Sequence, residues 1–130
     1  MDVPVFLAHI PCGFPSPADD FREPSLDLNE LVILHPDATF LVRVSGDSMK
    51  QAGIHDGDII VVDRAITPVH ASIIVARLND KFTVKRLYLK GESVYLLPAN
   101  SHYQPIKITS ELDFEVWGVV VAVVHLFVRT

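Results

Sequence analysis

Short apolar stretches rich in β-branched and aromatic residues follow one another along most of the chain. From residue 39 onward they occupy 39–45, 59–63, 72–78, 82–89, 93–97 and 114–128. Residues that tolerate tight or left-handed backbone separate several of them, at Asp56-Gly57-Asp58, Asn79-Asp80 and Lys90-Gly91-Glu92. Such stretches favour strands, and such separators favour turns. The pattern predicts a mostly β domain of several strands.

One segment before these strands has helical spacing instead. Asp27 is followed three residues later by Glu30, which is a pairing typical of a helix start. The apolar residues there recur at helical intervals as far as His35-Pro36, namely Leu28, Leu31 and Val32. We therefore expect one short helix, and at most two in the whole chain.

The two ends of the chain have distinct characters. Five of the nine prolines lie in the first 24 residues, at Pro4, Pro11, Pro15, Pro17 and Pro24. Because proline fixes φ and lacks a backbone donor, this segment is predicted to be an extended arm. The most apolar stretch, 116–128, contains His125 and is shorter than the roughly 20 residues that cross a bilayer. It predicts a buried strand and no membrane association.

Composition and charge indicate a folded cytoplasmic protein and argue against one class of function, direct DNA binding. Hydrophobic residues make up 49% of the chain and charged residues 21%, which is typical of a folded protein. A formal charge of -5 argues against direct DNA binding, which depends on clustered Lys and Arg. The single cysteine, Cys12, excludes an internal disulfide, and the N-terminus lacks a secretory signal pattern. Both observations favour the cytoplasm.

A candidate nucleophile follows the first predicted strand of the β-rich part. In Gly46-Asp47-Ser48-Met49 the glycine permits a sharp exit from the strand, and the next residues can begin a helical turn. The backbone N–H groups of Ser48 and Met49 could then stabilise an oxyanion, which suits acyl transfer. An ordinary turn with a serine cap explains the same four residues, and the spacing alone favours that interpretation.

Serine needs a base that removes its proton, and two candidates remain open. His55 lies in the loop 53–57 and could reach Ser48, so a Ser-His-Asp arrangement is one of them. Lys85 falls inside the apolar run 82–89, where burial would lower its pKa from about 10.4 towards 7 to 8 and let the neutral amine accept a proton. Alternation along the run does not settle whether Lys85 faces the core or the solvent.

Three separated segments together resemble the UmuD and LexA family of self-cleaving proteins. They are Gly46-Asp47-Ser48-Met49, Phe82-Thr83-Val84-Lys85 and Cys12-Gly13-Phe14-Pro15-Ser16-Pro17. Further similarity occurs at Leu26-Asp27-Leu28-Asn29, Gly53-Ile54, Asp56-Gly57-Asp58, Ala65-Ile66 and 114–120. The resemblance therefore covers nearly the whole chain.

The resemblance implies a LexA/UmuD-like catalytic β domain with a Ser-Lys dyad. Ser48 and Lys85 match the nucleophile and the general base of that dyad, and Cys12 and Gly13 match the two sides of the bond that is cut. Residues 1–25 would be a flexible N-terminal arm containing the cleavage site, and residues 26–130 the catalytic and dimerisation β domain. No metal or other cofactor is required by this chemistry.

The same resemblance implies partners and a cellular role. In this family a RecA filament on single-stranded DNA stimulates the self-cleavage. The shortened product is a homodimer that joins a UmuC-like Y-family polymerase subunit, with the sliding clamp as a further partner, for SOS mutagenesis. Because only 11 residues precede Cys12, we expect no DNA-reading domain of the kind that LexA-like repressors carry.

Two other functions fit parts of the sequence. A non-catalytic dimeric adaptor for a translesion polymerase would use the same β domain, although the retained Ser48 and Lys85 weigh against it. A signal-peptidase-like enzyme would use the same dyad on other chains, but it needs a membrane anchor, and we expect none here.

Overall fold

The computed structural model describes residues 2–6 and 22–128, and the chain divides into two compact units, Met1–Leu34 and His35–Thr130. In the smaller unit β1 (Asp2–Phe6) pairs antiparallel with β2 (Arg22–Asp27). The helix α1 (Leu28–Val32) follows, and the Asp27 side chain caps it by accepting from the Asn29 N–H at 2.9 Å. The predicted short helix is therefore confirmed.

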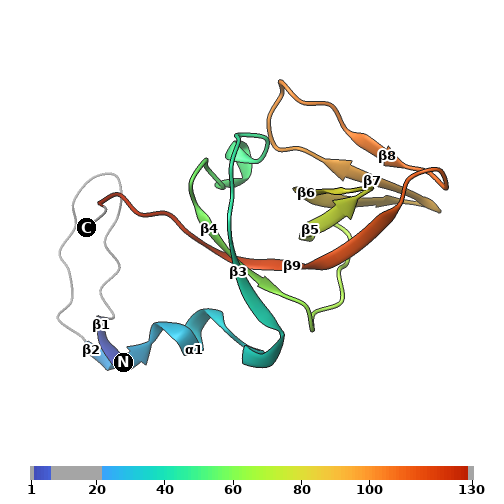
Figure 1. Cartoon of the computed structure of the whole chain (residues 1–130). Coiled ribbons are helices and arrows are strands. Elements are labelled where there is room, and N and C mark those ends of the chain that lie inside the picture. The colour runs from blue at the N-terminus through green and yellow to red at the C-terminus, as the bar shows by residue number, and fades with distance from the viewer. Residues whose placement is uncertain (1, 7–21, 129–130) are drawn as a thin grey trace. The chain divides into compact units, whose positions relative to one another are not determined.

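The larger unit is one antiparallel sheet, which confirms the mostly β prediction (Figure 1). Its strands run in the order β3-β4-β9-β5-β6-β7-β8. Their bounds are β3 (Thr39–Arg43), β4 (Ile59–Asp63), β5 (Ile73–Leu78), β6 (Lys81–Lys90), β7 (Ser93–Leu97), β8 (Ile106–Ile108) and β9 (Phe114–Val124). Two 3-10 helices, Pro36–Ala38 and Lys50–Ala52, lie at the start of β3 and between β3 and β4. The sequence pattern missed β8, because three residues are too few to show an alternation.

The last strand, β9, joins the two halves of the sheet. Its first half pairs with β5 and its second half with β4, and each ladder contains one register shift. The final partner pair is Ile59 with Val124, so the ladder between β4 and β9 ends at that point. The prediction of a buried strand over 116–128 was wrong at its end, because Phe127 is 93% exposed and Val128 is 76% exposed.

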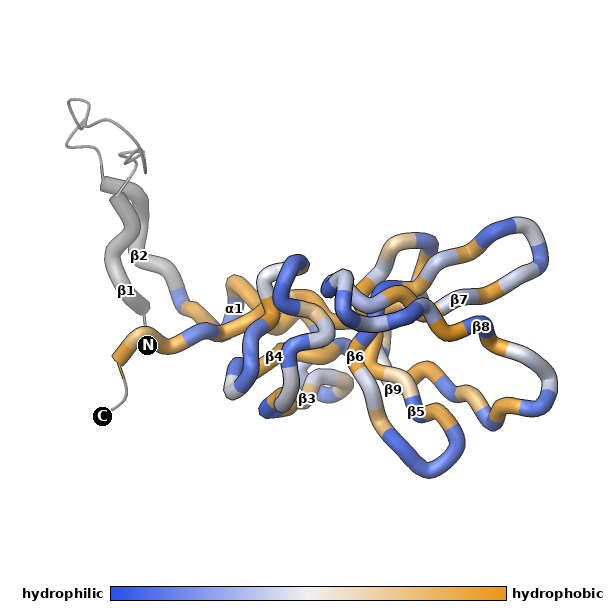
Figure 2. Tube along the Cα trace, turned by 90° about the horizontal axis from the view of Figure 1, so that it is seen from above, coloured by the Kyte–Doolittle hydropathy of each residue, from blue (hydrophilic) through white to orange (hydrophobic). Residues whose placement is uncertain are grey.

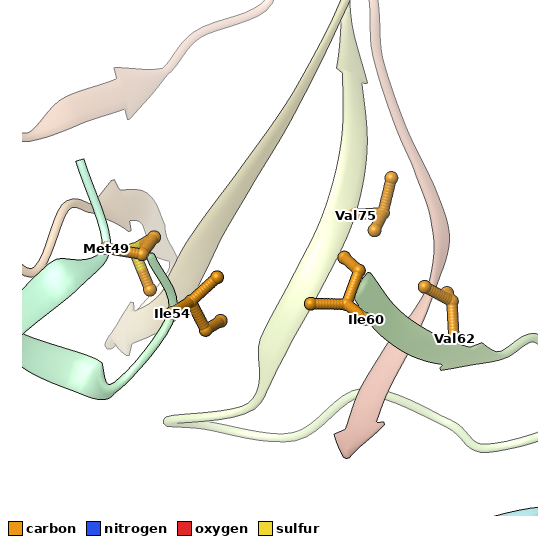
Figure 3. Packing of buried hydrophobic residues seen from close by; sticks show 5 residues of the cluster. All are labelled: Met49, Ile54, Ile60, Val62 and Val75. Atoms are coloured by element: carbon orange, nitrogen blue, oxygen red, sulfur yellow. The ribbon is translucent and has the colours of Figure 1, made fainter. Parts of the chain in front are cut away.

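Two clusters of buried side chains stabilise the sheet by removing apolar surface from water. One contains Ile74, Ala76, Leu87, Leu96 and Val119. The other contains Met49, Ile54, Ile60, Val62 and Val75, which come from the loop after β3 and from strands β4 and β5 (Figure 3). In Figure 2 the strands of the larger unit are mostly hydrophobic in colour, whereas several of the loops that join them are hydrophilic. Among the described residues no helix is long and apolar enough to cross a membrane.

Candidate active site

The loop between β3 and β4 carries Ser48 at its turn. Gly46 has φ +89°, a left-handed conformation that glycine adopts without steric cost, so the chain can leave β3 sharply. The Gly46 N–H donates to Asp56 Oδ1 at 2.7 Å, which fixes this exit to the far side of the same loop. The 3-10 helix Lys50–Ala52 begins two residues after Ser48. A short helical turn therefore follows the serine, as the sequence predicted.

Buried packing and backbone hydrogen bonds hold Ser48 in place. The next side chain, Met49, is only 3% exposed and packs in one cluster with Ile54 and with residues of β4 and β5. The Ser48 carbonyl accepts from the Ala99 N–H at 2.7 Å, and the Ala99 carbonyl accepts from the Gln51 N–H at 2.8 Å. The segment after β7 thus fixes the backbone on both sides of the serine.

Lys85 projects from β6 directly to the serine. Its Nζ donates to Ser48 Oγ at 3.0 Å, to Thr83 Oγ1 at 2.6 Å and to the Val84 carbonyl at 3.1 Å. The residue is 9% exposed, as is typical of a core position rather than a solvent-facing one. Leu87, two residues further along the strand, is likewise buried. The solvent-facing alternative for Lys85 is therefore wrong.

Burial lowers the pKa of the Lys85 amine below its ordinary value of 10.5, because an ammonium loses hydration when it leaves water. None of the three groups that Nζ contacts carries a negative charge. A lysine with a lowered pKa is neutral in a larger fraction of molecules at a given pH. The neutral amine can accept a proton from a hydroxyl at hydrogen-bond distance.

The other candidate base, His55, lies elsewhere. Its Nδ1 is 3.7 Å from Asp58 Oδ2, and its ring is 5.3 Å from the ring of His125 between centroids. His55 is not among the residues that line the cleft at Ser48. The structure therefore places Lys85, and not His55, within hydrogen-bond distance of Ser48. The Ser-His-Asp arrangement with His55 is not formed.

A cleft of about 360 Å³ opens beside the pair. Its apolar lining comes from Val42, Val44, Met49, Ile54, Val75, Phe82 and Val84. The backbone N–H groups of Ser48 and Met49 donate to no acceptor within the residues that the structure describes. They are thus available to an oxygen in the cleft. The predicted cleavage site, Cys12 and Gly13, lies outside the described residues.

Sequence reasoning missed the side chains that support the serine loop from the segment after β7. The Tyr103 hydroxyl donates to Asp47 Oδ1 at 2.6 Å, and this bond holds the pKa of Asp47 below its ordinary value and raises that of Tyr103. The buried Asn100 donates through Nδ2 to the Asp47 carbonyl at 2.9 Å. No local pattern marks these residues, whereas Thr83 could have been found from its position two residues before Lys85 on one strand face.

We predict that Tyr103→Phe slows any reaction that depends on Ser48. The substitution removes one hydrogen bond to an ionised carboxylate next to the serine, so the loop is less well held. The rate should fall by about tenfold, which corresponds to roughly 1.4 kcal/mol. Tyr95→Phe is a matched control, since Tyr95 lies on β7 and does not line the cleft. Equal rates for Tyr103→Phe and the unmodified chain would show that Tyr103 has no positioning role.

Known proteins resemble the chain over most of its length. Residues 4–121 match the family model described as peptidase S24-like. Protein SamA of Salmonella typhimurium is 48% identical over 122 residues, which cover 94% of this chain and 84% of SamA. Protein MucA of Escherichia coli is 44% identical over 119 residues, covering 91% of this chain and 81% of MucA.

A LexA repressor is also similar to the chain. The repressor of Acidithiobacillus ferrooxidans is 37% identical over 123 residues, which cover 92% of this chain and 60% of the repressor. The resemblance inferred from the sequence motifs is thus confirmed by independent comparisons. The chain belongs to the peptidase S24-like family of autoproteolytic serine peptidases, as a UmuD-like member of its SOS mutagenesis proteins.

Proposed function

We propose that this chain cuts the Cys12-Gly13 bond of its own N-terminal arm, with Ser48 as the nucleophile and Lys85 as the general base. The observation that carries the proposal is the 3.0 Å hydrogen bond between Lys85 Nζ and Ser48 Oγ beside an open cleft. Membership of an autoproteolytic peptidase family supports the reaction type. The small Gly13 suits a bond whose backbone must approach Ser48 closely.

In the proposed mechanism neutral Lys85 takes the Ser48 proton as Oγ attacks the Cys12 carbonyl carbon. The backbone N–H groups of Ser48 and Met49 stabilise the oxyanion. The C–N bond then breaks, Lys85 returns the proton to the departing Gly13 amine, and the Cys12 acyl group remains on Ser48 as an ester. Water, deprotonated by Lys85, hydrolyses that ester and frees the serine.

This mechanism predicts that self-cleavage accelerates as the pH rises. Only the neutral amine is a base, so the rate should increase about tenfold per pH unit below the pKa of Lys85 and level off above it. Because burial lowers that pKa, the plateau should begin below 10.5. The first-order rate of fragment release, measured without any partner across neutral to alkaline buffers, tests this. A flat profile would contradict the assignment of Lys85 as base.

The cellular part of the proposal follows from the family. A RecA filament on single-stranded DNA would stimulate the cut in the cytoplasm. The shortened chain would act as a homodimer and as the accessory subunit of a UmuC-like Y-family polymerase, with the sliding clamp as a further contact. The outcome would be error-prone copying of damaged DNA, in keeping with the SOS mutagenesis family to which the chain belongs.

The second candidate is a non-catalytic dimeric adaptor for a translesion polymerase. It requires only the β domain and its surfaces, and it makes no use of the cleft. The effect of substituting Ser48 or Lys85 on polymerase-dependent mutagenesis distinguishes the two functions. Under the proposed mechanism Ser48→Ala and Lys85→Ala each block arm removal, and polymerase-dependent mutagenesis is lost with it. Under the adaptor alternative the chain is never cut, and both variants support mutagenesis as well as the unmodified chain does.

A further inference from the structure

A second cluster of reactive side chains lies in the larger unit, apart from the cleft at Ser48. His55 and Asp58 come from the loop that leads into β4, and His125 is the first residue after β9. One ligand atom from each of the three lies within 4.8 Å of the others. Residues 67 positions apart in the sequence thus meet at one point.

Hydrogen bonding accounts for only part of this arrangement. His125 Nδ1 is 2.5 Å from Asp58 Oδ1, so these two groups form a hydrogen bond. His55 Nδ1 lies 3.7 Å from the other carboxylate oxygen, Oδ2, which is beyond hydrogen-bond range. Two ligand atoms at about 2.0 to 2.2 Å from one tetrahedral zinc ion are roughly 3.3 Å apart. The 3.7 Å gap is close to that spacing.

A hydrogen bond fixes the orientation of the Asp58 carboxylate, as is usual for a carboxylate that binds a metal ion. Asp58 is only 4% exposed, and its Oδ2 accepts from the His55 backbone N–H at 2.7 Å. Hydrogen bonds of this kind fix the direction of metal-binding carboxylates. Both histidines are exposed and can adjust by side-chain rotation.

Space and charge beside the cluster also suit a cation. A pocket of about 90 Å³ adjoins it, lined in part by Asp56, Asp58 and His125, which leaves room for a water molecule as a further ligand. Arg43 lines the same pocket, but its guanidinium donates to the Gly57 carbonyl at 3.0 Å. The carboxylates of Asp56 and Asp58 outnumber this single positive charge.

We propose that His55, Asp58 and His125 bind a divalent transition-metal ion, with zinc as the best fit. Two imidazoles and one carboxylate suit zinc, cobalt or nickel rather than magnesium or calcium, which prefer sites made of oxygen alone. The bound ion ties the segment after β9 to the loop that follows the Ser48 turn. The site is independent of the Ser-Lys chemistry and takes no part in it.

The test is a titration of the full chain with zinc by calorimetry and with cobalt by visible absorption. Cys12→Ser is present throughout, because a thiol would bind either ion by itself. The chain should bind a single zinc ion, and cobalt should give the absorption bands of a low-coordinate site. His55→Gln and His125→Gln should each weaken binding by about a hundredfold or more. His102→Gln, a change at another exposed histidine, should bind like the parent.

Two results would overturn the proposal. One is the absence of zinc binding by the parent chain, which would leave the cluster as a hydrogen-bond network only. The other is unchanged affinity in both His55→Gln and His125→Gln, which would put the ion elsewhere. Thermal unfolding without metal serves as the folding check, because both histidines are exposed and their replacement should leave the melting temperature nearly unchanged.

Discussion

Under the proposed mechanism, Lys85→Ala nearly abolishes self-cleavage. The variant keeps Ser48 and the backbone donors but loses the group that removes the serine proton. General bases contribute about 10² to 10⁴ in rate, so the expected loss is at least a hundredfold. The rate of fragment release at alkaline pH, followed by gel electrophoresis, measures it. The loss should not come from unfolding, because the partners that the structure describes for the Lys85 amine are two hydroxyls and a carbonyl, so no charged group among them would be left buried.

Lys81→Ala is the matched control for this prediction. Lys81 lies on the same strand, β6, but it is exposed and does not line the cleft. Its replacement should leave the rate of self-cleavage unchanged. Far-ultraviolet circular dichroism and thermal unfolding establish whether both variants are folded. A Lys85→Ala chain that is folded and cuts at the unmodified rate would remove Lys85 from the mechanism.

Gly118→Val should strongly destabilise the fold. Gly118 lies in β9 where that strand approaches β4 so closely that an added Cβ would stand 2.6 Å from Val62 Cγ1 and 3.2 Å from the Asp63 carbonyl oxygen. A Cβ cannot occupy that space unless the core shifts. Overpacking of this kind costs about 1 to 3 kcal/mol, and the larger valine should be at the upper end. Urea unfolding gives the change in free energy.

A double-mutant cycle with Gly118→Ala separates this steric effect from a change in backbone entropy. Val62→Ala removes the methyl group that the new Cβ would meet, so Gly118→Ala should cost less in that background than alone. The φ of Gly118 is not in the left-handed range, so backbone strain does not enter. Strict additivity of the two substitutions would contradict the contact as the cause.

The sequence predicted most strands of the larger unit, because each of those strands is a short apolar run that can be recognised without knowledge of its partners. The runs at 59–63 and 93–97 coincide with β4 and β7, and the others agree to within a few residues, except at the end of β9. The overextension of β9 to residue 128 has a physical reason. A strand ends where its partner ends, and the partner, β4, lies more than fifty residues away in the chain.

The contact between Ser48 and Lys85 could be predicted only in part. The tetrapeptide at Ser48 and the apolar run at Lys85 contain the two side chains that the structure brings to 3.0 Å, but pattern alone could not choose between Lys85 and His55 as the neighbour of Ser48. That choice depends on which face of β6 meets the core, a property of its pairing with β5. The bond from Tyr103 to Asp47 spans 56 residues, and no periodicity in either segment encodes it.

Mass spectrometry of the purified chain is the most direct test of Ser48-dependent cleavage at Cys12-Gly13. The unmodified chain and Ser48→Ala are incubated at mildly alkaline pH and, separately, with RecA, single-stranded DNA and nucleotide. If Ser48 cuts this bond, the unmodified chain alone splits into a fragment ending at Cys12 and a fragment beginning at Gly13, in both conditions. An intact unmodified chain in both conditions, or the same split in Ser48→Ala, would contradict it.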